Sequence, residues 1–178
     1  MRIISGTYKG RTLQLPSNFR LRPTTDFAKT GLFNVLNNQF DFEAVRVLDL
    51  FAGTGSISYE FVSRGCRDIT SVDISQHAYS YIRETMQSLG IPNAHVLKAD
   101  VFRFLEKSAN TYDVIFADPP YDMKEAIELP ALILDQKKML RPGGWLIVEH
   151  ASRNTLDQHT TYKETRKYGN VSFSIFEA

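Results

Sequence analysis

The sequence predicts one α/β domain in which a mostly parallel β-sheet is covered by helices on both faces. Three observations support this fold class. From residue 46 onward, short apolar runs alternate with longer segments of helical periodicity, as in sheets built from βαβ units. A turn of small residues containing two glycines follows the first of these runs. The segments 161–167 and 171–176 flank a Tyr-Gly-Asn turn, which predicts an antiparallel hairpin at the end of the chain.

Composition is that of a soluble globular protein with a single core. The chain has 178 residues, of which 43% are hydrophobic and 23% charged. No apolar run approaches the length that spans a bilayer, and residues 1–6 lack the apolar stretch of a signal peptide, so we expect a cytoplasmic protein without membrane contact. Cys66 is the only cysteine, and the four histidines are scattered, so neither an internal disulfide nor a metal site is expected.

The first part of the chain, 1–40, is expected to be an extension that packs on the main domain at 41–178. Residues 2–15 alternate apolar and polar side chains around two glycines, which predicts a small β-hairpin. A loop over 16–25 leads to a helix over 27–38, with Thr25 or Asp26 as its cap.

Charge is unevenly distributed between the extension and the rest of the chain. Residues 1–30 hold six basic residues and one acid, a net charge of +5, whereas residues 31–178 sum to −4. A basic arm of this kind is a reasonable footprint for a nucleic acid, and charge alone fits a solvated hairpin equally well. The candidate phosphate contacts are Arg2, Lys9, Arg11, Arg22 and Lys29.

From residue 46 to residue 149 the chain alternates strands with helices. Alternation of this kind requires right-handed crossovers and places the carboxyl ends of the parallel strands at one edge of the sheet. The strands are expected over 46–51, 69–73, 94–98, 112–117 and 144–149, and the helices over 56–64, 75–89, 101–108 and 123–139.

The turn after the first strand is a candidate cofactor site. Glycines at positions 53 and 55 lack the Cβ atom that would keep a ligand away from the backbone, and the following helix begins with unpaired N–H groups. In an open α/β sheet, ligands bind at this edge. A tight strand-to-helix connection without a ligand is an equally good interpretation of the turn alone. The candidate residues are Phe51, Ala52, Gly53, Thr54 and Gly55.

Two aspartates favour a particular class of cofactor. Asp73 ends the second strand eighteen residues after Gly55, where an acid accepts hydrogen bonds from ribose hydroxyls, and Ile74 follows it. Either a dinucleotide or S-adenosylmethionine fits this acid. Ser58 stands where a dinucleotide fingerprint has its third glycine, and Asp49 provides a charge-assisted partner for the ammonium group of S-adenosylmethionine. The sequence therefore favours S-adenosylmethionine.

The third strand leads to a further candidate contact for the adenine ring. Asp100 is placed to hold the adenine amino group, while Val101 and Phe102 border the ring. Asp100 fits equally well as nothing more than the cap of the helix that follows.

The fourth strand ends in the sharpest motif of the chain, Asp118-Pro119-Pro120-Tyr121. Two prolines fix φ and remove two backbone donors, which leaves a rigid shelf whose carbonyl oxygens accept hydrogen bonds. An exocyclic amine on a heterocycle needs acceptors to orient it toward an electrophilic methyl group. Asp118 and the Pro119 carbonyl provide these acceptors, and Tyr121 provides a face on which a base stacks.

These motifs resemble the amino-group branch of S-adenosylmethionine-dependent methyltransferases and, more closely, the RsmD family. The resemblance extends over nearly the whole chain and is most specific near the N-terminus. The segments that carry it are 1–6, 21–26, 32–34, 48–55, 118–121 and 148–150.

The resemblance implies a fold, a reaction and a partner. The fold is a Rossmann-like methyltransferase domain with a mostly parallel, seven-stranded sheet and an antiparallel C-terminal hairpin. The reaction is methylation of the N2 amine of a guanine in small-subunit (16S) ribosomal RNA, within a small-subunit assembly intermediate. The alternatives are an adenine-N6 methyltransferase acting on DNA or RNA, a non-catalytic RNA-binding assembly factor and, third, a dehydrogenase.

Overall fold

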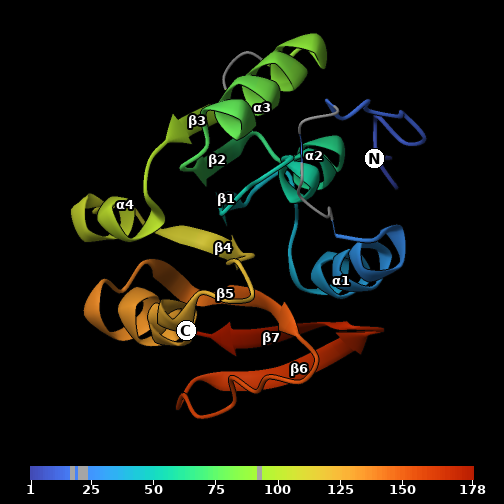
Figure 1. The fold of residues 1–178 in the computed structure, drawn as a ribbon. Helices are drawn as coiled ribbons and strands as arrows, with labels where there is room; N and C mark the ends of the chain where they lie inside the picture. The colour runs from blue at the N-terminus through green and yellow to red at the C-terminus, as the bar shows by residue number, and fades with distance from the viewer. Residues whose placement is uncertain (17–18, 20–23, 92–93) are drawn as a thin grey trace.

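A seven-stranded sheet forms the centre of the computed structural model, which describes residues 1–16, 19, 24–91 and 94–178 (Figure 1). The strand order is β3-β2-β1-β4-β5-β7-β6. Pairing is parallel from β3 to β5 and antiparallel for the last three strands, which confirms the predicted fold class. The strands are β1 Arg46–Leu50, β2 Asp68–Asp73, β3 His95–Lys98, β4 Tyr112–Ala117, β5 Leu140–Ala151, β6 Tyr162–Tyr168 and β7 Val171–Glu177.

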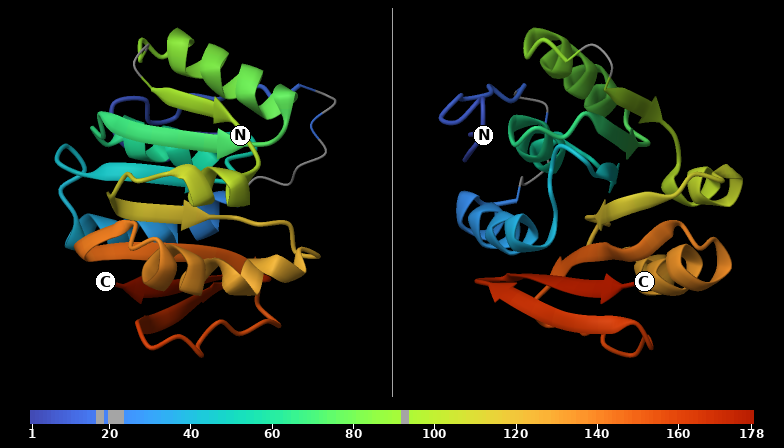
Figure 2. Two further views of the ribbon diagram at one scale, coloured as in Figure 1. Left: turned by 90° about the vertical axis from the view of Figure 1, so that its left-hand side faces the viewer. Right: turned by 180° about the vertical axis from the view of Figure 1, so that it is seen from behind.

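Helices cover both faces of the sheet (Figure 2). One face packs against α1, α2 and α3 in a core cluster that includes Phe33, Phe61 and Ile82. The opposite face packs against α4 and the segment before β5 through Leu105 and Ile133. The helices are α1 Asp26–Gln39, α2 Ser56–Ser63, α3 Gln76–Ser88 and α4 Val101–Lys107. No helix among the described residues has both the length and the apolar character that crossing a bilayer requires.

The strand order reverses direction between β1 and β4, which makes this pair the topological switch point of the sheet. Chain connections leave β1 toward β2 on one side and enter β4 and β5 on the other. The connections after β1 and β4 therefore lead to opposite faces of the sheet, and open α/β sheets bind ligands at the carboxyl ends of the strands at such a point. Figure 1 looks onto this edge of the sheet.

The segment predicted as a helix over 123–139 is helical over 124–136, but it is not one regular α-helix. The segment folds as a short 3₁₀ helix, η1 Lys124–Glu128, followed by a π-helical turn, η2 Ala131–Gln136. Pro130 lies between them and has no N–H, so it cannot continue an α-helical hydrogen-bond ladder. The ladder resumes with wider spacing, as the Lys137 N–H donates to the Leu132 carbonyl at 3.0 Å.

The hairpin predicted over 2–15 forms only in part. Its two arms are antiparallel and the Ile3 N–H donates to the Arg11 carbonyl at 3.1 Å, but the only bridge between them is Arg2 to Thr12. The tip also binds α2. The Thr7 N–H donates to the Ser63 carbonyl at 2.6 Å, and a Cβ on Gly6 would lie 1.8 Å from that carbonyl oxygen.

Candidate active site

The turn after β1 has left-handed backbone angles at three positions, two of which are glycines. Phe51, Gly53 and Gly55 have φ values of 58°, 54° and 74°, all in the left-handed region. A Cβ on Gly55 would lie 2.8 Å from the ring of Tyr59 and 3.0 Å from Ile82. Gly55 is also the N-cap of α2 and has no side chain with which to cap the helix, and the Asp49 carboxylate accepts a backbone hydrogen bond from Ser58 in the first turn instead. Ala52 and Thr54 are buried within this turn.

Asp73 connects the tip of β2 to this turn. Its Oδ2 accepts the Gly53 N–H at 2.8 Å and its Oδ1 accepts the Ser75 N–H at 2.8 Å. The cap of α3 is Ser75, so Asp73 does not serve as that cap. Each carboxylate oxygen can accept a second hydrogen bond, which leaves the side chain able to bind ribose hydroxyls. Ile74 beside it is 65% exposed at the same edge.

Asp49 lies beneath the turn and is almost completely buried, with 2% of its surface exposed. Ser58 Oγ donates to Asp49 Oδ2 at 2.5 Å and also lies 2.7 Å from Ser71 Oγ. Burial raises the pKa of Asp49 to about 7, against the effect of the Ser58 hydrogen bonds. A cationic ligand group near the turn would favour the ionised form of Asp49. The contact between Asp49 and the ammonium group of the cofactor stays a prediction.

Asp100, Val101 and Phe102 border the same edge on its α4 side. Asp100 is the N-cap of α4, and its Oδ1 accepts the Arg103 N–H at 3.0 Å. The ring of Phe102 lies 6.5 Å from that of Phe51, at 68° to it. The capping role predicted for Asp100 is therefore present, while a contact to adenine stays a prediction.

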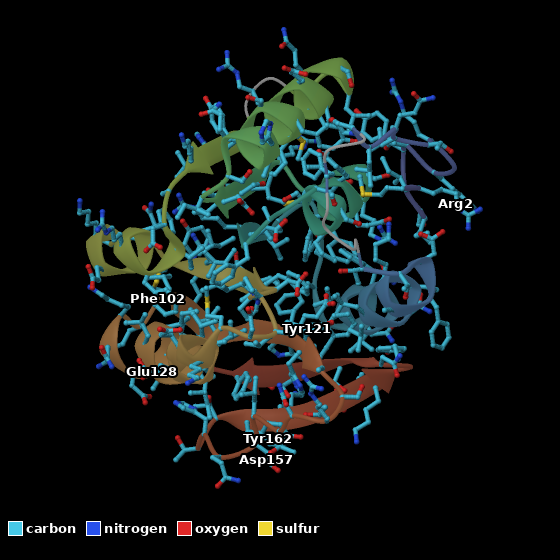
Figure 3. The ribbon with its side chains drawn as sticks, viewed as in Figure 1. Arg2, Phe102, Tyr121, Glu128, Asp157 and Tyr162 are labelled. Atoms are coloured by element: carbon cyan, nitrogen blue, oxygen red, sulfur yellow. The ribbon has the colours of Figure 1, made fainter. Side chains whose placement is uncertain are left out.

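The Asp118-Pro119-Pro120-Tyr121 segment begins where β4 ends. The Asp118 N–H donates to the Leu50 carbonyl at 3.3 Å, which fixes the start of the segment beside the glycine turn. Pro119 is buried and Pro120 is exposed. Tyr121 is 51% exposed and lies at the centre of the edge in Figure 3, with Phe102 on α4 to one side. The segment thus has a rigid base and an accessible ring.

Glu149, at the end of β5, is a site residue that was not among the predicted ones. Only 3% of it is exposed, and its Oε2 accepts the Thr24 hydroxyl at 2.9 Å. Tyr121 also hydrogen-bonds its carboxylate, and burial raises the pKa of Glu149 to about 7. The sequence feature that could have identified Glu149 is its position as an acid at the end of the strand next to β4. His150, which follows it, lies on the opposite face, 2.8 Å from Ser174 Oγ, and burial lowers its pKa.

Asp118 and Glu149 lie side by side because their strands are in register. Ala117 pairs with Val148 across β4 and β5, so the next residue on each strand is again a neighbour. Burial raises the pKa of Asp118 well above its ordinary value, and the charges of Glu149 and Asp49 add to this effect. Three carboxyl groups from three adjacent strands therefore meet at this edge.

The predicted basic contacts are not equivalent. Lys9 and Arg11 are exposed, and Arg2 is exposed while paired with Asp26 at 3.1 Å. Arg22 lies outside the described residues. The assignment of Lys29 to RNA contact is wrong, because only 1% of the side chain is exposed.

Lys29 instead belongs to a buried ionic network around Glu60. Its Nζ donates to Glu60 Oε1 at 3.1 Å and to the Arg2 carbonyl at 2.7 Å. Glu60 also accepts the Ile4 N–H at 2.9 Å and forms an ion pair with Arg64. The network joins the extension, α1 and α2, so Lys29 has a structural role.

Comparison with known proteins points to one family. Residues 1–177 match the family described as "Conserved hypothetical protein 95". The chain is 35% identical to "Putative rRNA methyltransferase YlbH" of Bacillus subtilis, over 99% of this chain and 98% of that protein. It is 30% identical to "Ribosomal RNA small subunit methyltransferase D" of Escherichia coli K12, over 84% of this chain and 71% of that protein.

A solved structure shows the same fold over the full length of the chain. It is described as "Putative methyltransferase yhhF from Escherichia coli" and has a TM-score of 0.85 at 26% identity. The similarity covers 99% of this chain and 97% of that one. The extension and the C-terminal hairpin are thus part of the shared architecture.

Proposed function

Because the chain belongs to the RsmD family of ribosomal RNA small subunit methyltransferases, we propose that it methylates the N2 amine of a guanine in 16S ribosomal RNA with S-adenosylmethionine. The observation that carries the proposal is the position of the Asp118–Tyr121 segment, directly beside the glycine turn at the switch point of the sheet. A methyl acceptor and a methyl donor would meet there.

The residues at the turn fit the proposed cofactor. Ser56 Oγ, in the first turn of α2, is buried and has no hydrogen-bond partner among the described residues, which a bound polar ligand would supply. Asp73 is the acid for the ribose hydroxyls, and Asp49 is the nearby carboxylate for a cationic end. S-adenosylmethionine, when bound, supplies an electrophilic methyl group.

The protein's own contribution to the reaction is orientation of the amine. The lone pair of an exocyclic amine is delocalised into the heterocycle, so acceptors on its N–H groups are needed to aim it. Asp118 and the Pro119 carbonyl are those acceptors, and the half-exposed ring of Tyr121 is the surface on which the flipped base stacks. The amine's surplus proton becomes acidic after methylation, and Asp118 is in place to accept it.

The RNA contacts and setting follow from the same proposal. Lys9 and Arg11 bind backbone phosphates from the exposed part of the extension, and Arg2 and Arg22 are further candidates. The substrate is a small-subunit assembly intermediate in the cytoplasm. The extension over 1–40 serves RNA binding and the remainder serves catalysis.

Labelled S-adenosylmethionine, incubated with the protein and 16S ribosomal RNA either free or in subunit particles, tests the proposal. Nucleoside analysis should identify N2-methylguanine as the labelled product. N6-methyladenine would move the chain to the alternative amino-group methyltransferases. RNA binding without any methyl transfer, with saturating cofactor and both RNA forms, would identify a non-catalytic assembly factor.

A further inference from the structure

We infer that Glu149 is a positioning residue for methyl transfer, which acts through Asp118 and Tyr121 and links both to the N-terminal extension. The inference rests on the proposed function of the Asp118–Tyr121 segment. Glu149 does not need to touch the substrate for this role. It occupies the buried side of the shelf, while Tyr121 presents its ring to the accessible side.

The sheet register places Glu149 against Asp118. Neighbouring strands lie about 4.8 Å apart, and residues in register have their side chains on the same face. The pairing of Ala117 with Val148 makes Asp118 and Glu149 the next such pair. Ile147, two residues before Glu149, belongs to the core cluster under α1 and α2, so Glu149 points to that same face.

Two hydrogen bonds hold the Glu149 carboxylate and determine what it positions. One comes from Thr24 Oγ1 at 2.9 Å and the other from the Tyr121 hydroxyl. Thr24 directly precedes Thr25, which caps α1. A single buried carboxylate therefore connects the start of α1, the aromatic ring of the shelf and the neighbourhood of the amine acceptor.

Burying the Glu149 carboxylate is energetically unfavourable compared with burying an apolar side chain, which argues for a role beyond packing. Removing a carboxylate from water carries a large desolvation cost, and none of the ion pairs among the described residues gives Glu149 a cationic partner. Its neighbours are hydroxyls and another carboxyl group. Such an arrangement favours one shared proton between Asp118 and Glu149 near neutral pH.

The charge on Glu149 therefore adds to the effect of burial on the ionisation of Asp118. The groups that face the pair are Asp49 from β1, Tyr121 from the loop after β4, and the neutral Thr24 from the segment before α1. Burial, then Glu149, then Asp49 raise the pKa of Asp118. Replacing Glu149 with a neutral group removes one of these causes, so the pKa of Asp118 falls. The ionised form is the stronger acceptor for the amine N–H groups and the one that can later take up the surplus proton.

The test compares Glu149→Gln with the wild type over a range of pH. Glutamine keeps an acceptor for Thr24 and Tyr121 and removes the negative charge. Single-turnover methyl transfer at saturating cofactor should rise with pH in both proteins, with the rise displaced to lower pH by on the order of one pH unit in Glu149→Gln. Glu149→Ala, which also loses both hydrogen bonds, should lower transfer at every pH, and Glu149→Gln should retain most of it at high pH.

A matched control and a second measurement distinguish failure of the inference about Glu149 from failure of the proposed function. Glu164→Gln makes the same chemical change on β6, in a residue paired with Arg166, and should leave the pH profile unchanged. Carbon-13 NMR titration of the Asp118 carboxyl should show a lower pKa in Glu149→Gln, whether or not RNA is methylated. An Asp118 titration and a pH profile that both match the wild type would overturn the inference. A wild type that methylates no RNA would instead refute the proposed function.

Discussion

Four carboxyl groups lie at the carboxyl ends of the parallel strands, and burial raises the pKa of three of them. Asp49, Asp118 and Glu149 are each shifted toward the protonated form, mainly by loss of water contact. Asp73 differs, because two backbone N–H groups hold its oxygens at the turn. The site thus combines one carboxylate held by two backbone N–H groups with three carboxyl groups whose pKa is raised by burial.

Stability without cofactor should fall as pH rises through the range in which Asp49 ionises. Its pKa of about 7 in the folded protein lies above the ordinary value of 3.8, so the folded state binds the proton more tightly and loses stability between these values. The loss is up to about 4 kcal/mol. We therefore compare the free energy of unfolding of Asp49→Asn with that of the wild type, both from urea unfolding. The difference should be more favourable to Asp49→Asn at pH 8 than at pH 5. An equal difference at both pH values would contradict the assignment.

Cofactor affinity should depend on Asp73. Asp73→Ala removes the acceptor for the ribose hydroxyls, which should weaken S-adenosylmethionine binding by about 1.5–3 kcal/mol, roughly tenfold to a hundredfold. Calorimetric titration is the measurement. Asp68→Ala is the matched control, because Asp68 lies at the opposite end of the same strand and pairs with Arg46 there. Equal affinities for both variants would refute the role of Asp73.

At the scale of elements, the extension is held by a buried ionic network more than by strand pairing. Glu60 on α2 receives Lys29 from α1 and the Ile4 N–H from the extension. The guanidinium of Arg64 also lies 4.3 Å from the Phe33 ring. The start of the chain, α1 and α2 therefore behave as one unit.

Lys29→Met should strongly destabilise the protein because it leaves the buried Glu60 with one cationic partner fewer. The expected loss is about 3–5 kcal/mol in urea unfolding. Lys9→Met, at an exposed position, is the control and should change stability by no more than about 0.5 kcal/mol. A Lys29→Met protein as stable as the control would show that the network contributes little.

The sequence predicts those elements whose formation depends on residues close together in the chain. β1 and β4 were predictable because buried parallel strands are continuous apolar runs, and the turn between β1 and α2 because its glycines are a local requirement. The break at Pro130 also has a local cause, but the π-helical spacing after it depends on packing under the sheet. Burial of Lys29 depends on Glu60, thirty-one residues away, and no charge count reveals such a contact.

The candidate site shows the same division. The Asp118–Tyr121 segment and Asp73 were recognisable because each follows a strand at the expected spacing. Glu149 was missed because its contact to Thr24 spans 125 residues and arises only when β5 lies next to β4. Long-range neighbours of this kind are determined by sheet order.

For the molecule as a whole, the proposed RNA contacts and the proposed catalytic residues lie on differently charged parts of the protein. The exposed basic residues of the extension lie apart from the acidic strand ends, as the position of Arg2 relative to Tyr121 shows (Figure 3). Phosphate contacts would therefore hold the RNA beside the site without placing cations among the buried carboxyl groups.

Replacing both Lys9 and Arg11 with alanine should weaken RNA binding and flatten its dependence on salt. Each phosphate contact releases counterions from the RNA, so binding with fewer contacts releases fewer of them. The slope of log affinity against log salt should fall by about 1–2. Cofactor affinity should stay unchanged, since both residues lie outside the turn. Wild-type salt dependence in the double variant would exclude this surface as the RNA contact.

Single-turnover methyl transfer by Asp118→Ala tests the central claim, that this edge of the sheet orients an amine for methylation. The variant should bind S-adenosylmethionine within roughly threefold of the wild type, because the proposed cofactor contacts do not include Asp118. Transfer to 16S ribosomal RNA at saturating cofactor should fall by on the order of a hundredfold or more, since one orienting group is lost at the reacting centre. Transfer near the wild-type rate would contradict the account.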